Sequence, residues 1–157
     1  MKTLDFIRLD ANASNQVVNA LQQLLADYHV FYANLRGLHW NIQGKKFFAL
    51  HQKFEELYDE VADQIDEIAE RILTLGGVPA HNLSAYLKVA KLKESDYVAG
   101  SEQAVKLVLD NLAYLIAAER TVIEVAEKAN DEGTTAIMSD YIRDQEKLVW
   151  MYTAWLS

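Results

Sequence analysis

Residues 45–75 read KKFFALHQKFEELYDEVADQIDEIAERILTL, and this stretch decides the fold. Its apolar residues recur at steps of three and four, which is the period of one buried helix face. They are Phe47, Leu50, Phe54, Leu57, Val61, Ile65, Ile68 and Ile72. Because the tetrapeptide at 76–79, Gly-Gly-Val-Pro, ends the pattern, the sequence predicts one helix from about Lys45 to Leu75.

The same period predicts three more long helices, over about residues 12–40, 101–130 and 134–155. Ser14 is the expected N-cap of the first, since a serine hydroxyl accepts a hydrogen bond from the first helical turn. Gly44 supplies the conformational freedom needed for the turn that follows that helix.

Two breaks complete the pattern. The polar stretch 80–99 holds Tyr86, Leu87 and Val89, which indicate a short helical piece within a long connection, and the tetrapeptide at 130–133, Asn-Asp-Glu-Gly, separates the last two helices. One proline in 157 residues agrees with an all-α chain, because helix interiors exclude proline. We therefore expect a four-helix bundle forming one domain, 1–157, with up-down-down-up topology if the long connection crosses its length.

The composition excludes several classes of protein. No cysteine is present, so disulfides, thiolate zinc sites and cysteine nucleophiles are excluded. No apolar run approaches the roughly 18 residues that a membrane helix needs, and the first ten residues lack the apolar stretch of a signal peptide. We expect a cytoplasmic protein without membrane contact. Its net charge of −8 argues against electrostatic binding of nucleic acid.

Acidic residues crowd one part of the second long helix. Residues 55–70 hold Glu55, Glu56, Asp59, Glu60, Asp63, Asp66, Glu67 and Glu70, with no base among them. Solvated helix faces usually mix charges of both signs, because opposite charges at i,i+4 stabilise the helix. The run therefore leaves two interpretations about equally open: a solvated face, or a surface with a cation partner.

The histidines suggest a metal site of an unusual kind. None of the four follows a glutamate by three residues, as the centres inside ferritin-type bundles require. His51 and Asp66 are instead fifteen residues apart, about 22 Å along one helix, and cannot hold one ion together. Either they belong to separate sites, or two chains meet antiparallel in a two-fold dimer and each lends one half.

The segment His39-Trp40-Asn41, then His51, then the string Asp66-Glu67-Ile68-Ala69-Glu70-Arg71 resembles the Dps family, the miniferritins named for DNA-binding protein from starved cells. In that family a second histidine follows the first after twelve residues, an acid after fifteen more and a glutamate after four more. The resemblance implies a ferritin-like four-helix bundle with a short extra helix in the connection between helices 2 and 3. It further implies a homo-oligomer, the dodecameric shell.

The resemblance also implies a function. Dps proteins oxidise Fe(II) at ferroxidase centres on dimer interfaces, prefer hydrogen peroxide to dioxygen, and store ferric mineral inside the shell, which protects against oxidative stress. Carried over, His39 and His51 face Asp66 and Glu70 of the partner chain, and these four are the expected catalytic metal ligands. Glu55 is the expected second-iron or bridging ligand, and two irons are expected per centre.

Further sites follow from the same resemblance. Acidic residues near the start of the last helix line pores in the family, so Asp131 and Asp140 are the candidate pore residues. Asp144 and Glu124 are alternative candidates for the same role. Asp131 also suits a helix cap. Trp40, next to His39, is a candidate radical trap, with plain packing as the alternative. His29 and His81 fit no ligand interval, and we expect structural roles for both.

Two other functions are alternatives. A DNA-coating nucleoid protein is the main one, but Lys2 and Arg8 are balanced by Asp5 and Asp10, and we expect no basic tail after Trp155-Leu156-Ser157. A helical assembly that has lost catalysis is the other, and the intact ligand set argues against it.

Overall fold

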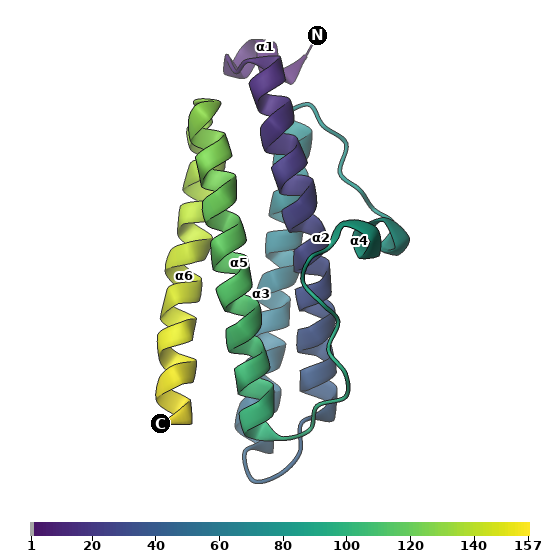
Figure 1. Cartoon of the computed structure of the whole chain (residues 1–157), viewed down its shortest axis with the longest axis vertical. Coiled ribbons are helices and arrows are strands. Elements are labelled where there is room, and N and C mark those ends of the chain that lie inside the picture. Colours follow the sequence, from purple (N-terminus) through teal and green to yellow (C-terminus); the bar gives the residue numbers. More distant parts are fainter. Residues whose placement is uncertain (1) are drawn as a thin grey trace.

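The computed structural model describes residues 2–157 and contains six α-helices and no strand over that range (Figure 1). Four long helices form the bundle, and two short ones lie outside it. The all-α prediction is confirmed. The helices are α1 (Thr3–Ile7), α2 (Ala11–Asn41), α3 (Phe47–Thr74), α4 (Leu83–Val89), α5 (Ser101–Lys128) and α6 (Glu132–Leu156).

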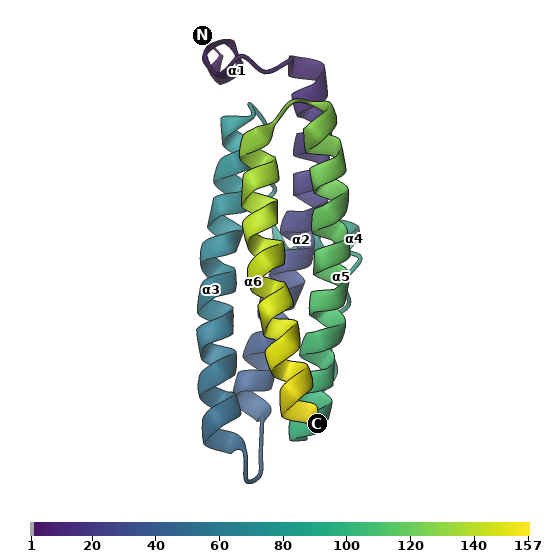
Figure 2. The same ribbon diagram turned by 90° about the vertical axis from the view of Figure 1, so that its left-hand side faces the viewer.

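The connection between α3 and α5 crosses the whole length of the bundle, so the predicted up-down-down-up topology is confirmed (Figures 1 and 2). At its start the Gln22 side chain donates to the Val78 carbonyl at 2.6 Å. At its end the backbone N–H of Gln43 donates to the Ala99 carbonyl at 3.0 Å. The predicted short helix in this connection is α4.

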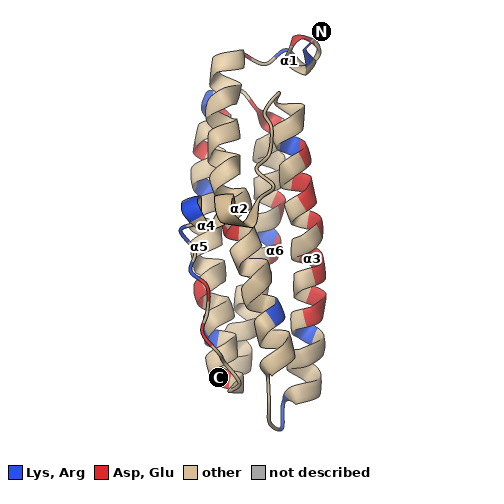
Figure 3. Ribbon diagram, turned by 90° about the vertical axis from the view of Figure 1, so that its right-hand side faces the viewer, with Lys and Arg blue, Asp and Glu red and all other residues tan. Residues whose placement is uncertain are grey.

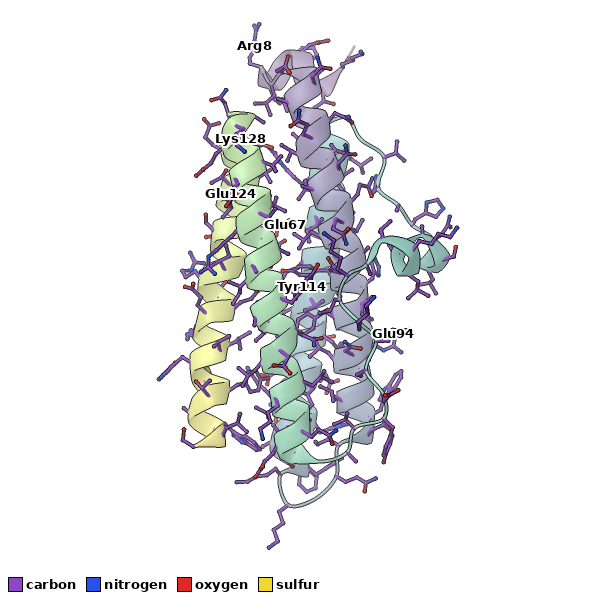
Figure 4. The ribbon with its side chains drawn as sticks, viewed as in Figure 1. Arg8, Glu67, Glu94, Tyr114, Glu124 and Lys128 are labelled. Carbon is purple, nitrogen blue, oxygen red and sulfur yellow. The ribbon has the colours of Figure 1, made fainter. Side chains whose placement is uncertain are left out.

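Two buried polar side chains of α2 hold the connection after α4 in place. The Asp27 carboxylate accepts hydrogen bonds from the amides of Lys91 at 2.6 Å and Leu92 at 2.9 Å, and from the Tyr114 hydroxyl at 2.8 Å. Figure 4 shows Tyr114 where α5 faces this segment. Asn34 accepts from the Ser95 amide at 2.9 Å. These bonds satisfy backbone groups of a segment that has no helix partners of its own.

The apolar period predicted for α3 corresponds to its buried face. Leu50, Phe54, Leu57, Val61, Ile68 and Ile72 are all buried, while Ile65 is half-buried. The opposite face carries the acidic residues of 55–70, which form a continuous stripe along the helix (Figure 3). Over the residues that the structure covers, no helix is long and apolar enough to span a membrane.

Two helix boundaries differ from the prediction. The N-cap of α2 is Asp10, whose carboxylate accepts from the Ala13 amide at 2.8 Å, so Ser14 lies inside the helix and is buried. The break before α6 depends on Asn130, which adopts φ 53°, and Gly133 lies within the helix. A Cβ at Gly133 would stand 2.7 Å from a guanidinium nitrogen of Arg71, which explains the glycine. The apolar pattern does not predict the short helix α1.

Candidate metal centre

His39 and His51 meet beside the turn that joins α2 to α3. Gly44, with φ 100°, allows this turn. The Nδ1 of His39 lies 2.7 Å from the carbonyl oxygen of His51, and the Nδ1 of His51 lies 2.8 Å from the carbonyl oxygen of His39. Their rings stack with centroids 3.8 Å apart and an interplanar angle of 17°. The backbone therefore fixes the orientation of both imidazoles.

This pairing assigns the tautomer of each ring. A carbonyl oxygen only accepts, so each Nδ1 must carry the proton and donate it. The lone pair is then on Nε2, and neither Nε2 has a hydrogen-bond partner within residues 2–157. Imidazoles that bind metals are held in this way, with one nitrogen donating to a carbonyl and the other free for the ion.

Aromatic rings surround the histidine pair. Phe47 stacks on His51 with centroids 4.8 Å apart, and Tyr58 meets His39 edge-on at 5.3 Å. His39 is buried, with 7% of its surface exposed. Glu55 is exposed one turn after His51 on the same helix face. The pair is thus rigid and shielded, with one carboxylate within a turn.

Asp66 and Glu70 lie elsewhere, about 22 Å and about 28 Å along α3 from His51. Both are exposed, and neither side chain has a hydrogen bond or ion pair within the part of the chain that the structure covers. In that same part, no three of the His, Asp and Glu side chains are grouped closely enough to hold a metal ion. Within one subunit, the histidine pair and these two carboxylates are therefore too far apart to bind one metal ion together.

The neighbouring Arg71 turns away from these carboxylates. Its guanidinium pairs with the buried Asp131 and donates to the Thr134 hydroxyl at 2.9 Å. Asp131 in turn accepts from the Thr134 amide at 2.9 Å and caps α6. The geometry thus favours the helix-cap alternative for Asp131. The other pore candidate, Asp140, is exposed and pairs with Arg143 at 2.8 Å.

Replacing Asp131 by Asn separates these two roles. We expect the free energy of unfolding to fall by about 2 kcal/mol, the usual worth of hydrogen bonds to a charged group, with little change in iron uptake. The matched variant Asp140→Asn should leave stability within about 0.5 kcal/mol of wild type. Urea unfolding at fixed protein concentration measures both. Slower iron uptake with unchanged stability in Asp131→Asn would instead indicate a pore residue.

Trp40 and His29 take up positions away from the histidine pair. The Trp40 ring is 62% exposed and lies 4.4 Å below the guanidinium carbon of Arg36, so its role as a radical trap stays a prediction. His29 stacks on Tyr86 of α4 at 3.9 Å, and burial lowers the pKa of its imidazole. That contact agrees with a structural role for His29. His81 is exposed on the connection.

A buried polar cluster in the bundle core was not predicted. The Tyr28 hydroxyl donates to Glu119 at 2.6 Å, and the Gln145 amide donates to the same Glu119 oxygen at 2.7 Å. Tyr141 lies beside Tyr28, with ring centroids 5.9 Å apart, and donates to Glu67. One feature of the sequence could have indicated this cluster: Glu119 occupies a position on the apolar face of α5, between Leu115 and Val122.

Glu119 has unusual chemistry for a carboxylate. It is fully buried, and desolvation raises the pKa of this group to about 7, although hydrogen bonds from Tyr28 and Gln145 oppose the rise. Its second oxygen, Oε2, has no hydrogen-bond partner, nor has Oε1 of Gln145. The cluster therefore holds a buried base whose strength is matched to neutral pH.

Comparison with known proteins agrees with this architecture. The family model of the ferritin-like domain matches residues 18–157. A DNA protection during starvation protein from Porphyromonas gingivalis is 47% identical over 98% of this chain and 97% of its own length. An uncharacterised protein from Haemophilus influenzae is 49% identical over 94% of this chain and 92% of its own length.

Solved structures show the same fold. A Dps protein from Vibrio cholerae, described as a member of the ferritin-like diiron-carboxylate superfamily, superposes with a TM-score of 0.93 at 52% identity. That match covers 95% of this chain and 94% of the other. A Dps protein from Bacillus brevis gives a TM-score of 0.90 at 36% identity, covering 93% and 98% of the two chains.

Proposed function

The chain belongs to the Dps family of ferritin-like proteins, and we propose that it oxidises Fe(II) at centres shared between two subunits and stores the ferric product in a hollow homo-oligomeric shell. Hydrogen peroxide is the proposed oxidant, and protection against oxidative stress is the proposed role. In the proposed centre, His39 and His51 of one subunit face Asp66 and Glu70 of another, and Glu55 assists.

One observation carries this proposal: a preorganised histidine pair with only Glu55 within a turn of it, and an unpaired Asp66 and Glu70 about 22 Å and about 28 Å away on the same helix. Neither half alone can hold iron. An antiparallel two-fold contact would bring the halves together twice, because each subunit then contributes the same surface. The resulting donor set of imidazole nitrogens and carboxylate oxygens suits Fe(II).

The proposed reaction balances without a further reductant. Two Fe(II) ions bound at one centre each give one electron to a single peroxide, which yields two Fe(III) and two hydroxide ions. Because both electrons are delivered together, no hydroxyl radical leaves the centre. The ligands hold the two ions close enough for this paired transfer, which is a proximity effect.

The acidic stripe of α3 supports storage. Within it, Glu60 lies near Asp144 of α6 and near Asp63, and partial desolvation together with these like charges raises the pKa of its carboxyl group. A surface with such an excess of negative charge concentrates cations. We propose that this face lines the inside of the shell and collects iron, which is the cation-partner interpretation of the sequence.

Exposed apolar side chains support the proposed association of subunits. Leu83 and Leu87 of α4 are 73% and 57% exposed, and Phe48, near His51, is 85% exposed. Apolar surface of this kind marks contacts between subunits. It lies on the connection and beside the histidine pair, where the proposed two-fold contact requires a covering chain.

The direct test is anaerobic loading with Fe(II), followed by a limiting pulse of peroxide. We expect ferric absorbance to rise rapidly with about two irons oxidised per peroxide, the stoichiometry of a paired two-electron transfer, and much faster than in air. Stopped-flow absorbance against a protein-free control measures both quantities. A rise no faster than in the control would reject the ferroxidase function and favour an assembly protein without catalysis.

Binding to DNA is the second candidate, because several relatives carry the name DNA protection during starvation protein. The charge of this chain does not favour it. A net charge of −8 per subunit repels phosphates, and affinity for DNA depends mainly on Lys and Arg contacts to the backbone. We therefore propose protection through removal of iron and peroxide.

A further inference from the structure

One outer face of α3 repeats as regularly as its buried face. From Phe48 to Leu73, residues that are exposed or half-buried follow one another at alternating steps of four and three. Such steps keep residues on one side of a helix, and they are typical of a helix that packs lengthwise against another. Together these residues form the exposed seam of α3: Phe48, Gln52, Glu55, Asp59, Ala62, Asp66, Ala69 and Leu73.

The exposed seam is polar or small in its middle and apolar at both ends. Phe48 is 85% exposed and Leu73 is 54% exposed. The two side chains are about 37 Å apart along the helix, so they cannot contact each other within one chain. A single exposed apolar side chain is common on a protein surface, but these two end one continuous row. Both ends therefore lack a cover that the subunit itself could supply.

The exposed seam is symmetric about its middle. Phe48 and Leu73 are equally far from the point between residues 60 and 61, and so are Glu55 and Asp66. A two-fold axis at that point lays the seam antiparallel on its own copy, because such an axis exchanges equivalent positions. Phe48 of one subunit then faces the partner subunit's Leu73, and Glu55 faces the partner subunit's Asp66.

The spacing of the proposed ligands gives nearly the same axis independently. An axis that sets His51 opposite the partner's Asp66 and the partner's Glu70 crosses α3 between residues 58 and 61. The apolar ends, which have no part in that assignment, place the axis between residues 60 and 61. Two unrelated sets of side chains thus agree to within about 3 Å along the helix.

We propose that Phe48 and the partner subunit's Leu73 form an apolar clamp at each end of the two-fold contact, and that the two clamps set the register in which the shared centre is completed. The proposal rests on the proposed function, since it concerns the same centre. Burial of apolar surface drives the contact. A slip of one helical turn moves each Phe48 about 5 Å from its partner, so only one register buries both ends.

The register also accounts for the surroundings of the centre. Phe48 contacts Phe47, with ring centroids 5.3 Å apart, and Phe47 stacks on His51, so each clamp closes one side of a histidine pair. Glu55, one turn after His51, stands opposite the partner's Asp66, and the centre receives carboxylates from both chains. The other acids of the run lie about 100° further round the helix, clear of the exposed seam. They are Glu56, Glu60, Asp63 and Glu67.

Site-directed cross-linking of the assembled protein tests the register. The chain has no cysteine, so introduced cysteines report only the chosen positions. The test variant is Phe48→Cys with Leu73→Cys, treated with a bismaleimide that spans about 10 Å, one helix diameter. Each single variant is a matched control, because equivalent positions of the two chains lie about 37 Å apart in this register. Phe48→Cys with Thr74→Cys controls for the face, since Thr74 lies about 100° around the helix from Leu73.

We expect covalent dimers on denaturing gels from the test variant, at a yield at least about tenfold above all three controls, because only its cysteines come within reach of the linker. An assembled test variant without dimers, or equal yields in a control, would overturn the clamp. Rapid iron oxidation without cross-linked dimers would reject the clamp alone. Cross-linked dimers in protein that oxidises iron no faster than protein-free solution would reject the proposed function and leave the contact in place.

A thermodynamic cycle serves if the paired cysteines weaken assembly. Phe48→Ala, Leu73→Ala and the double variant are compared through the subunit dissociation constant, measured by sedimentation over a dilution series. Distant residues that share no partner act independently, so their effects on this constant multiply. We expect the double variant to raise the constant by clearly less than that product, because both single changes remove the same contact between chains. Effects that multiply would contradict the clamp.

Discussion

Replacing His51 by Ala is expected to reduce the initial rate of Fe(II) oxidation to that of protein-free solution, with assembly unchanged. The change removes one Nε2 ligand. It keeps the backbone carbonyl that accepts from Nδ1 of His39, so the remaining imidazole stays oriented. Loss of an outer-shell partner of a metal ligand already costs about 10- to 100-fold, and loss of the ligand itself should cost more.

His81→Ala is the matched control, because His81 is exposed on the connection and fits no ligand spacing. Stopped-flow absorbance gives the rates, and size-exclusion chromatography reports assembly. Initial rates in His51→Ala that equal those of His81→Ala would show that the histidine pair is not the site of oxidation.

Replacing Glu119 by Gln is expected to stabilise the protein at pH 8 by about 3 kcal/mol, the equivalent of raising a pKa from 4.5 to about 7. The folded chain binds this proton more tightly than the unfolded chain. The contribution of Glu119 to the wild-type free energy of unfolding should therefore be greatest below about pH 4.5. It should fall as the pH rises to about 7 and stay low above that pH.

The amide introduced by Glu119→Gln carries no charge at any of these pH values, so this part of the pH dependence should disappear. Chemical unfolding at several pH values and one protein concentration measures it, since oligomer stability depends on concentration. Glu146→Gln is the control, because Glu146 is exposed and pairs only with Arg120 at the surface. Equal pH profiles for wild type and Glu119→Gln would show that Glu119 is not a buried, protonatable acid.

The long helices could be predicted because their apolar faces repeat every three or four residues, and burial follows that period closely in α3. The bounds of α3 differ from the prediction by two residues or fewer. Spacing along a helix also converts directly into distance, which excluded a single ion held by His51 and Asp66 of the same chain. These features depend on local geometry and can be derived from one chain.

Features that depend on contacts between distant segments could not be predicted. One boundary was wrong for a local reason instead: α2 begins earlier than predicted, so Asp10 and not Ser14 is its N-cap. Gly133 resembles a helix breaker, but it makes room for Arg71, which lies far earlier in the chain. The core cluster joins Tyr28 to Glu119 across 91 residues, and only the structure brings them together.

The shared centre is the central claim, and complementation between two inactive variants tests it most directly. One chain carries His51→Ala, and the other carries Asp66→Ala with Glu70→Ala. At a mixed two-fold interface, the first supplies the carboxylates and the second supplies both histidines, so one of the two centres is complete. We expect each variant alone to be inactive and a random one-to-one co-assembly to recover about a quarter of the wild-type rate. Co-assemblies that contain both chains and remain inactive would contradict a centre built from two subunits.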